Sequence, residues 1–241
     1  MFEDVDQLKA KLDALRPLPV NTVKSLHEQM VLEWTYNSNA IEGNTLTIKE
    51  TKVVLEGITI GGKLMREHFE AINHKEAIQY VEDLVSSEEA FTEHTIKSIH
   101  QLVLKNIDVD NAGTYRKDNV MISGADHIPP DHYDVALQMS ELIETYKNSN
   151  VHPIERAARL HTDFVKVHPF IDGNGRTARL LMNFELMRAG YLPVIITASE
   201  RFTYYDSLDK AHTQNDYSDF IKIVVDAEKE AISKVLKLIG A

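Results

Sequence analysis

Residues 168–179 read His-Pro-Phe-Ile-Asp-Gly-Asn-Gly-Arg-Thr-Ala-Arg. Apolar residues then follow with helical spacing at Leu180, Leu181, Met182, Phe184, Leu186 and Met187. This spacing predicts a buried helix that ends near Gly190 and Pro193, because glycine favours the C′ position and proline cannot continue a helix. The quoted stretch is therefore a turn at a helix N-terminus, where free N–H groups and the positive end of the helix dipole attract an anion.

The residue types in this turn predict a polyphosphate site. Gly173 and Gly175 allow the backbone to approach an anion closely. Arg176 and Arg179 are three positions apart on one helix face, so both can reach the same charged group. The histidine and the aspartate of the same stretch add a base and a carboxylate next to that group.

The stretch resembles the signature of the Fic/Doc family, His-Pro-Phe-x-Asp/Glu-Gly-Asn-Gly-Arg-x-x-Arg, and matches every fixed position of it. The resemblance implies a protein adenylyltransferase, which moves AMP from ATP to a Ser, Thr or Tyr hydroxyl of a target protein. It assigns His168 as the general base, and an ordinary imidazole pKa of about 6.5 suits that task near neutral pH. It assigns Asp172 to Mg²⁺, the cofactor, which prefers oxygen ligands and bridges the α- and β-phosphates.

The same resemblance assigns the nucleotide-binding residues. Gly173, Asn174 and Gly175 would hold the phosphates through backbone N–H groups, and the Asn174 side chain would add a donor. Arg176 and Arg179 would neutralise the β- and γ-phosphates and support the departure of pyrophosphate.

A second informative stretch covers residues 38–44, Ser-Asn-Ala-Ile-Glu-Gly-Asn. Ser38 and Glu42 share a helix face, and Gly43 predicts that the helix ends there. A carboxylate in a last helical turn meets the negative end of the dipole, so Glu42 is either solvated or held by a cation. The stretch resembles the inhibitory motif of Fic proteins, which implies that Glu42 pairs with Arg179 and prevents ATP from binding in a reactive pose. In some members the same glutamate positions water for removal of AMP.

Residues 115–130 interrupt the helical spacing. Val120, Met121 and Ile122 favour a strand, Ser123 and Gly124 favour a turn, and two prolines end the return. A β-hairpin and a plain surface loop both fit this pattern. In proteins that resemble this one, the hairpin is a flap that holds an extended target segment by strand addition.

Two tyrosines after the signature helix have two interpretations. By their position in similar proteins, Tyr204 and Tyr205 line the adenine or ribose pocket, but they also fit the core. Many relatives carry an asparagine seven residues later, where this chain has His212, so the resemblance leaves the purine preference open. Three further residues fit packing roles better than catalytic ones: Asn73, His74 and His161.

Composition sets the broad class. The chain has 241 residues, 43% of them apolar, and a net charge of −11. This charge argues against a nucleic-acid binder, which needs a basic surplus. The absence of cysteine excludes disulfides and Cys-type zinc sites. No signal peptide and no apolar run of about 20 residues is visible, so we expect a cytoplasmic protein without a membrane partner.

The spacing predicts one all-α domain, and the resemblance implies a Fic-type helical bundle with the small β-hairpin flap. Helices are expected near 3–14, 23–41, 48–56, 64–84, 92–105, 133–146, 153–167, 176–189 and 217–238, with a further segment around Tyr204. Residues 1–60 form an N-terminal helical arm that includes the inhibitory helix, about 23–43. Residues 61–241 form the catalytic core with the flap, about 115–130.

Other functions fit parts of the sequence. Relatives transfer UMP, phosphate or phosphocholine, but the phosphate-transferring branch departs at the signature glycines and this chain does not. A catalytically silent binding module predicts a damaged His168 or Asp172, and both are intact. The target protein cannot be read from the sequence, and self-modification and a homodimer are compatible with it.

Overall fold

The computed structural model describes residues 1–241, and all of its regular structure is helical. Its ten α-helices are α1 (Glu3–Asp13), α2 (Val20–Ile41), α3 (Ile48–Leu55), α4 (Met65–Ser86), α5 (Glu93–Val103), α6 (Val135–Asn148), α7 (Pro153–Val167), α8 (Asn174–Arg188), α9 (Arg201–Gln214) and α10 (Ser218–Leu238). Two short 3-10 helices, η1 (His132–Asp134) and η2 (Ala198–Glu200), precede α6 and α9. The prediction of an all-α fold is confirmed.

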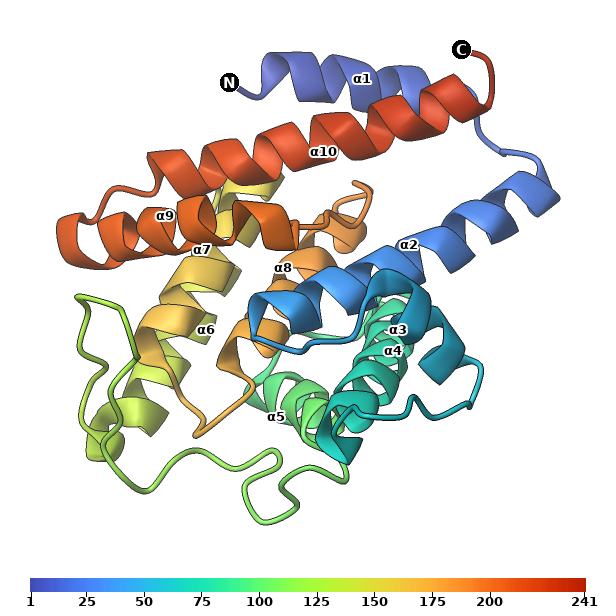
Figure 1. Ribbon diagram of the computed structural model, residues 1–241. Coiled ribbons are helices and arrows are strands. Elements are labelled where there is room, and N and C mark those ends of the chain that lie inside the picture. Colours follow the sequence, from blue (N-terminus) through green and yellow to red (C-terminus); the bar gives the residue numbers. More distant parts are fainter.

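Helix α8 is the centre of the molecule. Every residue from Arg176 to Leu186 is buried, including Asn183 and Glu185. A helix that is apolar on most sides requires neighbours on all of them, and α7, α4, α5 and α2 supply these neighbours (Figure 1). The packing fixes the N-terminal end of α8, and therefore the turn that precedes it.

The two N-terminal helices lie on different parts of this bundle. Helix α1 lies along α10 at the top of Figure 1, where Asp6 accepts hydrogen bonds from Tyr191 and His152. Helix α2 then runs back across the molecule and packs on α3, α4 and α8. Its C-terminal end points at the start of α8.

The predicted helix boundaries differ from the observed ones by a few residues. Helix α2 begins at Val20, directly after Pro19, three residues earlier than predicted. Glu42 is the C-cap of α2 and lies just outside its last turn. Helix α3 begins after the predicted capping box, in which Thr47 and Glu50 bind each other's backbone N–H groups.

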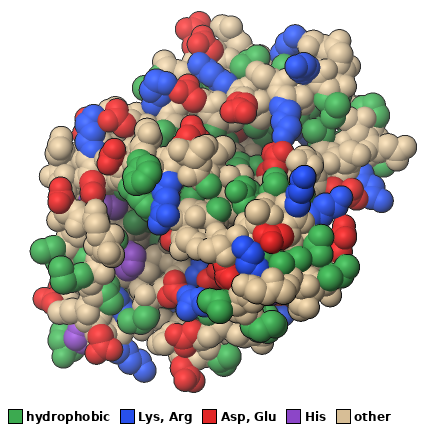
Figure 2. All heavy atoms as spheres, in the orientation of Figure 1, with side chains coloured by type: hydrophobic (Ala, Val, Ile, Leu, Met, Phe, Trp, Pro, Cys, Tyr) green, Lys and Arg blue, Asp and Glu red, His purple; other side chains and the backbone are tan.

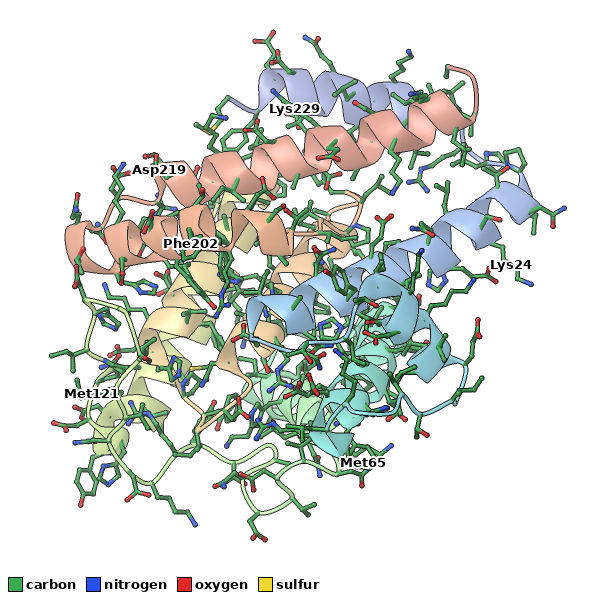
Figure 3. All side chains as sticks on the ribbon, in the orientation of Figure 1. Lys24, Met65, Met121, Phe202, Asp219 and Lys229 are labelled. Carbon is green, nitrogen blue, oxygen red and sulfur yellow. The ribbon has the colours of Figure 1, made fainter.

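The predicted β-hairpin is not formed. Residues 115–130 contain turns and bends but no strand, and Met121, labelled in Figure 3, projects into solvent. A two-stranded hairpin is marginal without a third strand, and no third strand is present beside this loop. Pro129 and Pro130 also remove two N–H donors from the returning arm.

Arg116 holds the base of this loop instead of strand pairing. Its side chain donates to the carbonyl oxygens of His168 (2.9 Å), Asp118 (3.0 Å) and Pro130. Its backbone N–H donates to the Pro169 carbonyl at 2.9 Å. One buried guanidinium therefore joins both arms of the loop to the catalytic turn.

None of the helices combines the length and the apolar character that crossing a bilayer requires.

Candidate active site

The turn before α8 begins with His168, the C-cap of α7. Its backbone is left-handed (φ 49°, ψ 57°), and its N–H donates to the Phe164 carbonyl at 3.1 Å. This conformation reverses the chain direction within one residue and is uncommon outside glycine. Burial lowers the pKa of the His168 imidazole to about 4, so the ring is neutral and able to accept a proton at neutral pH.

The Asn174 side chain closes the turn. Its Nδ2 donates to the Phe170 carbonyl at 2.8 Å, and its Oδ1 accepts from the Phe170 N–H at 3.0 Å. In this structure the amide is buried and turned inward, and its contact with the phosphates stays a prediction. Asn174 instead fixes the shape of the loop, and Phe170 anchors that loop in the core.

His100 supports the turn from α5, a role that no sequence motif indicated. Its Nε2 lies 2.9 Å from the Asp172 carbonyl, and its Nδ1 accepts from the Gly113 N–H at 2.9 Å. The ring also stacks on Phe170 with centroids 3.5 Å apart. Burial lowers the pKa of His100 to about 4, so the neutral tautomer with its proton on Nε2 satisfies both contacts.

Glycine is required at the two positions of the turn for different structural reasons. Gly173 is the N-cap of α8 and has a φ of 76°, which other residues rarely adopt. Gly175 is helical, but a methyl group placed on it would overlap the carboxylate of Glu42. The Glu42 carboxylate therefore lies against the first turn of α8, where the N–H groups lack helical acceptors.

Arg176 is buried and incompletely paired. Its Nη2 donates to Asp172 Oδ1 at 3.2 Å, and Glu70 Oε1 lies 3.6 Å from Nη1. Its Nε and Nη1 have no hydrogen-bond partner. Buried charged donors without acceptors are costly, so this guanidinium is suited to an additional anion.

Asp172 is surrounded by donors. Arg66 and Arg176 each contact its carboxylate, and the Gly173 N–H donates to Oδ1 at 2.5 Å. Burial alone would raise the pKa of Asp172, but Arg176, the Gly173 N–H and Arg66 together hold it below its ordinary value. Arg66 and its helix neighbour Glu70 were both missed by sequence reasoning.

Figure 2 shows acidic and basic side chains side by side in the lower centre of this face, between the C-terminal end of α2 and the N-terminal end of α4. Met65, labelled in Figure 3, marks the start of α4, and Arg66 follows it. The chain after Glu42 is tied to the same helix, because Asn44 donates to Glu70 at 2.8 Å and the Thr45 N–H to Glu67 at 2.7 Å.

Arg179 has an acceptor for each of its side-chain nitrogens. Its Nε donates to Ser38 Oγ at 3.0 Å, its Nη2 to Ser38 O at 2.8 Å and to Glu42 Oε1 at 2.7 Å. Its Nη1 donates to the Tyr204 hydroxyl at 3.1 Å. The structure thus brings together the three residues Ser38, Glu42 and Arg179 that the sequence had paired across 137 to 141 positions.

The two tyrosines lie near Arg179 and the C-terminal end of α2. Tyr204 is 1% exposed and contacts Arg179 and His161 Nε2, which lies 3.1 Å from its hydroxyl. Tyr205 is half-buried and donates to the Ile41 carbonyl at 3.1 Å, at the end of α2. The core interpretation is correct for Tyr204, and both side chains fix the surroundings of Arg179.

His212 is buried between α9 and α7. Its Nε2 is 2.9 Å from the Thr162 carbonyl, and burial lowers the pKa of its ring to about 4. Its neighbour His127 is 5.0 Å away between ring centroids. His212 therefore connects α9 to α7.

The residues near Asp172 fit a magnesium ion that arrives with phosphates. No group of three or more His, Asp or Glu side chains is arranged around a metal position. Magnesium needs no such cage, because it commonly takes one or two carboxylates together with phosphate oxygens and water. Asp172 Oδ2 already faces a cation, the guanidinium of Arg66, on the more exposed side of the carboxylate.

The Glu42 carboxylate lies at the start of α8, against Arg179 and Gly175. A surface cavity of about 560 Å³ lies elsewhere, between α2, α3 and α4.

Comparisons with known proteins agree with this geometry. Residues 90–186 match the Fic/DOC family. A protein adenylyltransferase Fic from Nematostella vectensis is 38% identical over 97% of this chain and 56% of its own length, and one from Aedes aegypti is 35% identical over 98% and 47%. The chain thus spans about half the length of the curated relatives it matches.

Two solved structures are similar over almost the whole chain. A Fic-1 segment from C. elegans has 32% identity and a TM-score of 0.90, and the match covers 99% of this chain and 72% of that one. A Fic domain containing signaling protein from Bacteroides thetaiotaomicron has 27% identity and a TM-score of 0.90, with 97% and 95% covered.

Proposed function

This chain belongs to the Fic/DOC family, and we propose that it is a protein adenylyltransferase restrained by Glu42. It transfers AMP from ATP to a Ser, Thr or Tyr hydroxyl of a target protein. The observation that carries the proposal is the pair of anion-binding groups at the start of α8. One, Arg176, has unpaired buried donors, and the other, Arg179, is occupied by a carboxylate of the same chain.

The chemistry uses the residues of the turn. The target hydroxyl oxygen attacks the α-phosphorus while neutral His168 accepts the hydroxyl proton, and the bond from the α-phosphorus to the bridging oxygen breaks. Pyrophosphate leaves with its negative charge facing Arg176 and the free N–H groups of the first turn of α8. Asp172 would hold Mg²⁺, which would neutralise charge on the phosphate oxygens.

The restraint follows from the position of Glu42. Its carboxylate pairs with Arg179 and covers Gly175, so a γ-phosphate and Glu42 compete for the same two groups. The arm of residues 1–60 would thereby keep ATP out of the reactive pose. The same carboxylate is close enough to the turn to position a water for removal of AMP from a modified target.

The loop of residues 115–130 would act as the target-binding flap. Its backbone groups at Val120 to Gly124 make no strand pairing within the chain. An extended target segment could therefore supply the missing strand. Arg116 joins the two ends of the flap to the carbonyl of His168. This contact would place the bound target segment near the imidazole that acts as general base.

Transfer of labelled AMP from α-labelled ATP with Mg²⁺ tests the proposal. We compare the wild type, Glu42→Gly and the double variant Glu42→Gly/His168→Ala, and read self-labelling where no target is known. Label on Glu42→Gly well above the wild type, and none on the double variant, is the expected result.

Glu56→Gly is the matched control. Glu56 caps α3 with nearly the same backbone as Glu42 (φ −86° and −83°) and also precedes a glycine of positive φ, but it contacts no arginine. Equal labelling of Glu42→Gly and the wild type would contradict the restraint. Absence of label from all variants on added protein substrates, with ATP binding intact, would contradict AMP transfer.

A further inference from the structure

Arg66 contacts the carboxylate that the proposed function gives to Mg²⁺. We propose that Arg66 acts as a gate on Asp172. Its guanidinium pairs with the Asp172 carboxylate in the absence of the magnesium–nucleotide complex and must move away when that complex binds. Arg66 therefore raises the Mg²⁺ concentration that nucleotide binding requires. The inference rests on the proposed function only in taking Asp172 as the magnesium ligand.

The two oxygens of Asp172 have different partners. Oδ1 accepts from the Gly173 N–H and from buried Arg176, both of which are fixed by the packing of α8. Oδ2 contacts Arg66, whose side chain is 53% exposed, whereas the Asp172 side chain is 37% exposed. Of the two arginines on this carboxylate, Arg66 is therefore the exposed one and Arg176 the buried one.

A guanidinium and a magnesium ion cannot both lie against Oδ2, because two cations at contact distance repel each other strongly in a partly buried site. Binding of the metal to this oxygen thus requires that Arg66 move away. The movement is local, because Arg66 is at the exposed N-terminal end of α4 and no helix has to shift.

Glu70 provides a partner for Arg66 after it leaves. It lies one turn further along α4, and its Oε1 already accepts from Arg66 Nε at 3.1 Å. Glu70 is itself held by Asn44 at 2.8 Å, so its carboxylate stays in place. Arg66 can therefore exchange Asp172 for Glu70 without exposing an unpaired charge.

The test measures nucleotide binding, not transfer. Calorimetric titration with an ATP analogue that has a methylene bridge between its α- and β-phosphates is repeated over a series of Mg²⁺ concentrations and in EDTA. All variants carry Glu42→Gly, so that the Glu42 carboxylate does not compete for the same groups. Arg66→Gln is the test variant, and Lys75→Gln, an exposed residue on the same helix with the same change of charge, is the control.

Arg66→Gln should lower the Mg²⁺ concentration for half-maximal binding by about three- to ten-fold, the range expected for a half-exposed charge pair. Lys75→Gln should not change it, and Arg66→Gln should have no effect on the Mg²⁺ dependence in an Asp172→Asn background. An unchanged Mg²⁺ dependence with normal thermal stability would overturn the gate. Weaker binding of the analogue by Arg66→Gln in EDTA as well as in Mg²⁺ would also overturn it, because Arg66 would then be a phosphate ligand.

These outcomes are independent of AMP transfer. If the enzyme transfers no AMP but the Mg²⁺ dependence shifts as expected, the proposed reaction fails and the gate remains.

Discussion

Glu42 shows how a carboxylate of the chain takes the place of an anionic ligand. It lies at the C-terminal end of α2, where the helix dipole disfavours a negative charge by a few tenths of a kcal/mol. Arg179 and the first turn of α8 attract the same charge, and both contact it. Glu42 is therefore held by Arg179 and the start of α8 and not by its own helix, and under the proposed function an incoming phosphate would compete with it directly.

Gly175 gives a prediction about this contact at the residue scale. Gly175→Ala in the wild type should lower the free energy of unfolding by about 1–3 kcal/mol, because the new methyl group overlaps the Glu42 carboxylate. In a Glu42→Gly background the nearest remaining atom is Arg179 Nη1 at 3.2 Å, the end of a long side chain. The substitution should then cost less than about 1 kcal/mol.

Urea unfolding of the four proteins in this double-mutant cycle measures the difference. A cost that is the same in both backgrounds would show that Glu42 is not held against α8 in solution.

The residues of the site that sequence reasoning found are those in two short motifs. Arg66 and His100 were missed because they reach Asp172 from 106 and 72 positions away, on helices whose spacing predicts only burial or exposure. The Asn174 side chain was expected to face the phosphates, whereas in the structure it binds the Phe170 backbone. A sequence shows that an amide is present, whereas the fold decides whether it faces inward.

At the scale of one element, α2 differs from the other helices around α8. The part of it that faces the site buries Thr35, Ser38 and Asn39, with Trp34 and Ile41 as the main apolar contacts. Ser38 accepts from Arg179, and Asn39 donates to the carbonyl oxygens of Thr35 within α2 and of Glu70 on α4, whereas Trp34 Nε1 and Thr35 Oγ1 have no partner. Polar contacts of this kind cost less to separate than an apolar interface of the same area, because water replaces the hydrogen bonds.

Ser38→Ala tests how tightly α2 is docked. The substitution removes the acceptor of Arg179 Nε and leaves a buried charged donor unpaired, at a cost of about 1–3 kcal/mol. We expect faster hydrogen exchange in residues 38–46 and AMP transfer between the levels of the wild type and Glu42→Gly. Ser207→Ala is the control, because Ser207 is equally buried but donates only within its own helix, to Tyr204 O at 2.7 Å.

Unchanged exchange in Ser38→Ala, with transfer at the wild-type level, would show that Arg179 does not hold α2 through this hydroxyl.

The helices could be predicted from the sequence better than the flap, because helix signals are local and strand pairing is not. The spacing of apolar residues and the caps at Thr47 and Thr92 are local, so most helices were placed to within a few residues, whereas α9 was expected only as a segment around Tyr204. The flap was predicted as a hairpin because Val120, Met121 and Ile122 favour strands. Strand formation needs a partner, however, and no other part of the chain pairs with this segment.

At the scale of the whole molecule, the first and the last helix of the chain pack on each other. Helix α1 lies on α10, and α10 holds the segment after α8 through Glu228, which accepts from the Leu192 N–H at 2.9 Å. Glu228 is fully buried, and its second oxygen has no partner. This contact joins α10 to the segment after α8, so protonation of the Glu228 carboxyl should change the free energy of unfolding of the whole fold.

Burial raises the pKa of Glu228 to about 8, against the smaller opposing effects of the Leu192 N–H and Lys9. The folded chain therefore holds a proton that the unfolded chain releases near pH 4.5. The stabilisation from this group is complete below that pH and is lost as the pH rises through about 8. At 1.36 kcal/mol per pKa unit, the loss is on the order of a few kcal/mol.

Glu228→Gln mimics the protonated acid, so it should remove this part of the pH dependence. Urea unfolding from pH 5 to 9 should give similar stabilities for Glu228→Gln and the wild type at pH 5, and a more stable variant at pH 9. The exposed neighbour Glu230→Gln serves as control, because it makes the same change of charge on the same helix and should follow the wild type throughout. If the two variants follow the same curve, Glu228 is ionised in the folded chain, and its unpaired oxygen must be hydrated within the core.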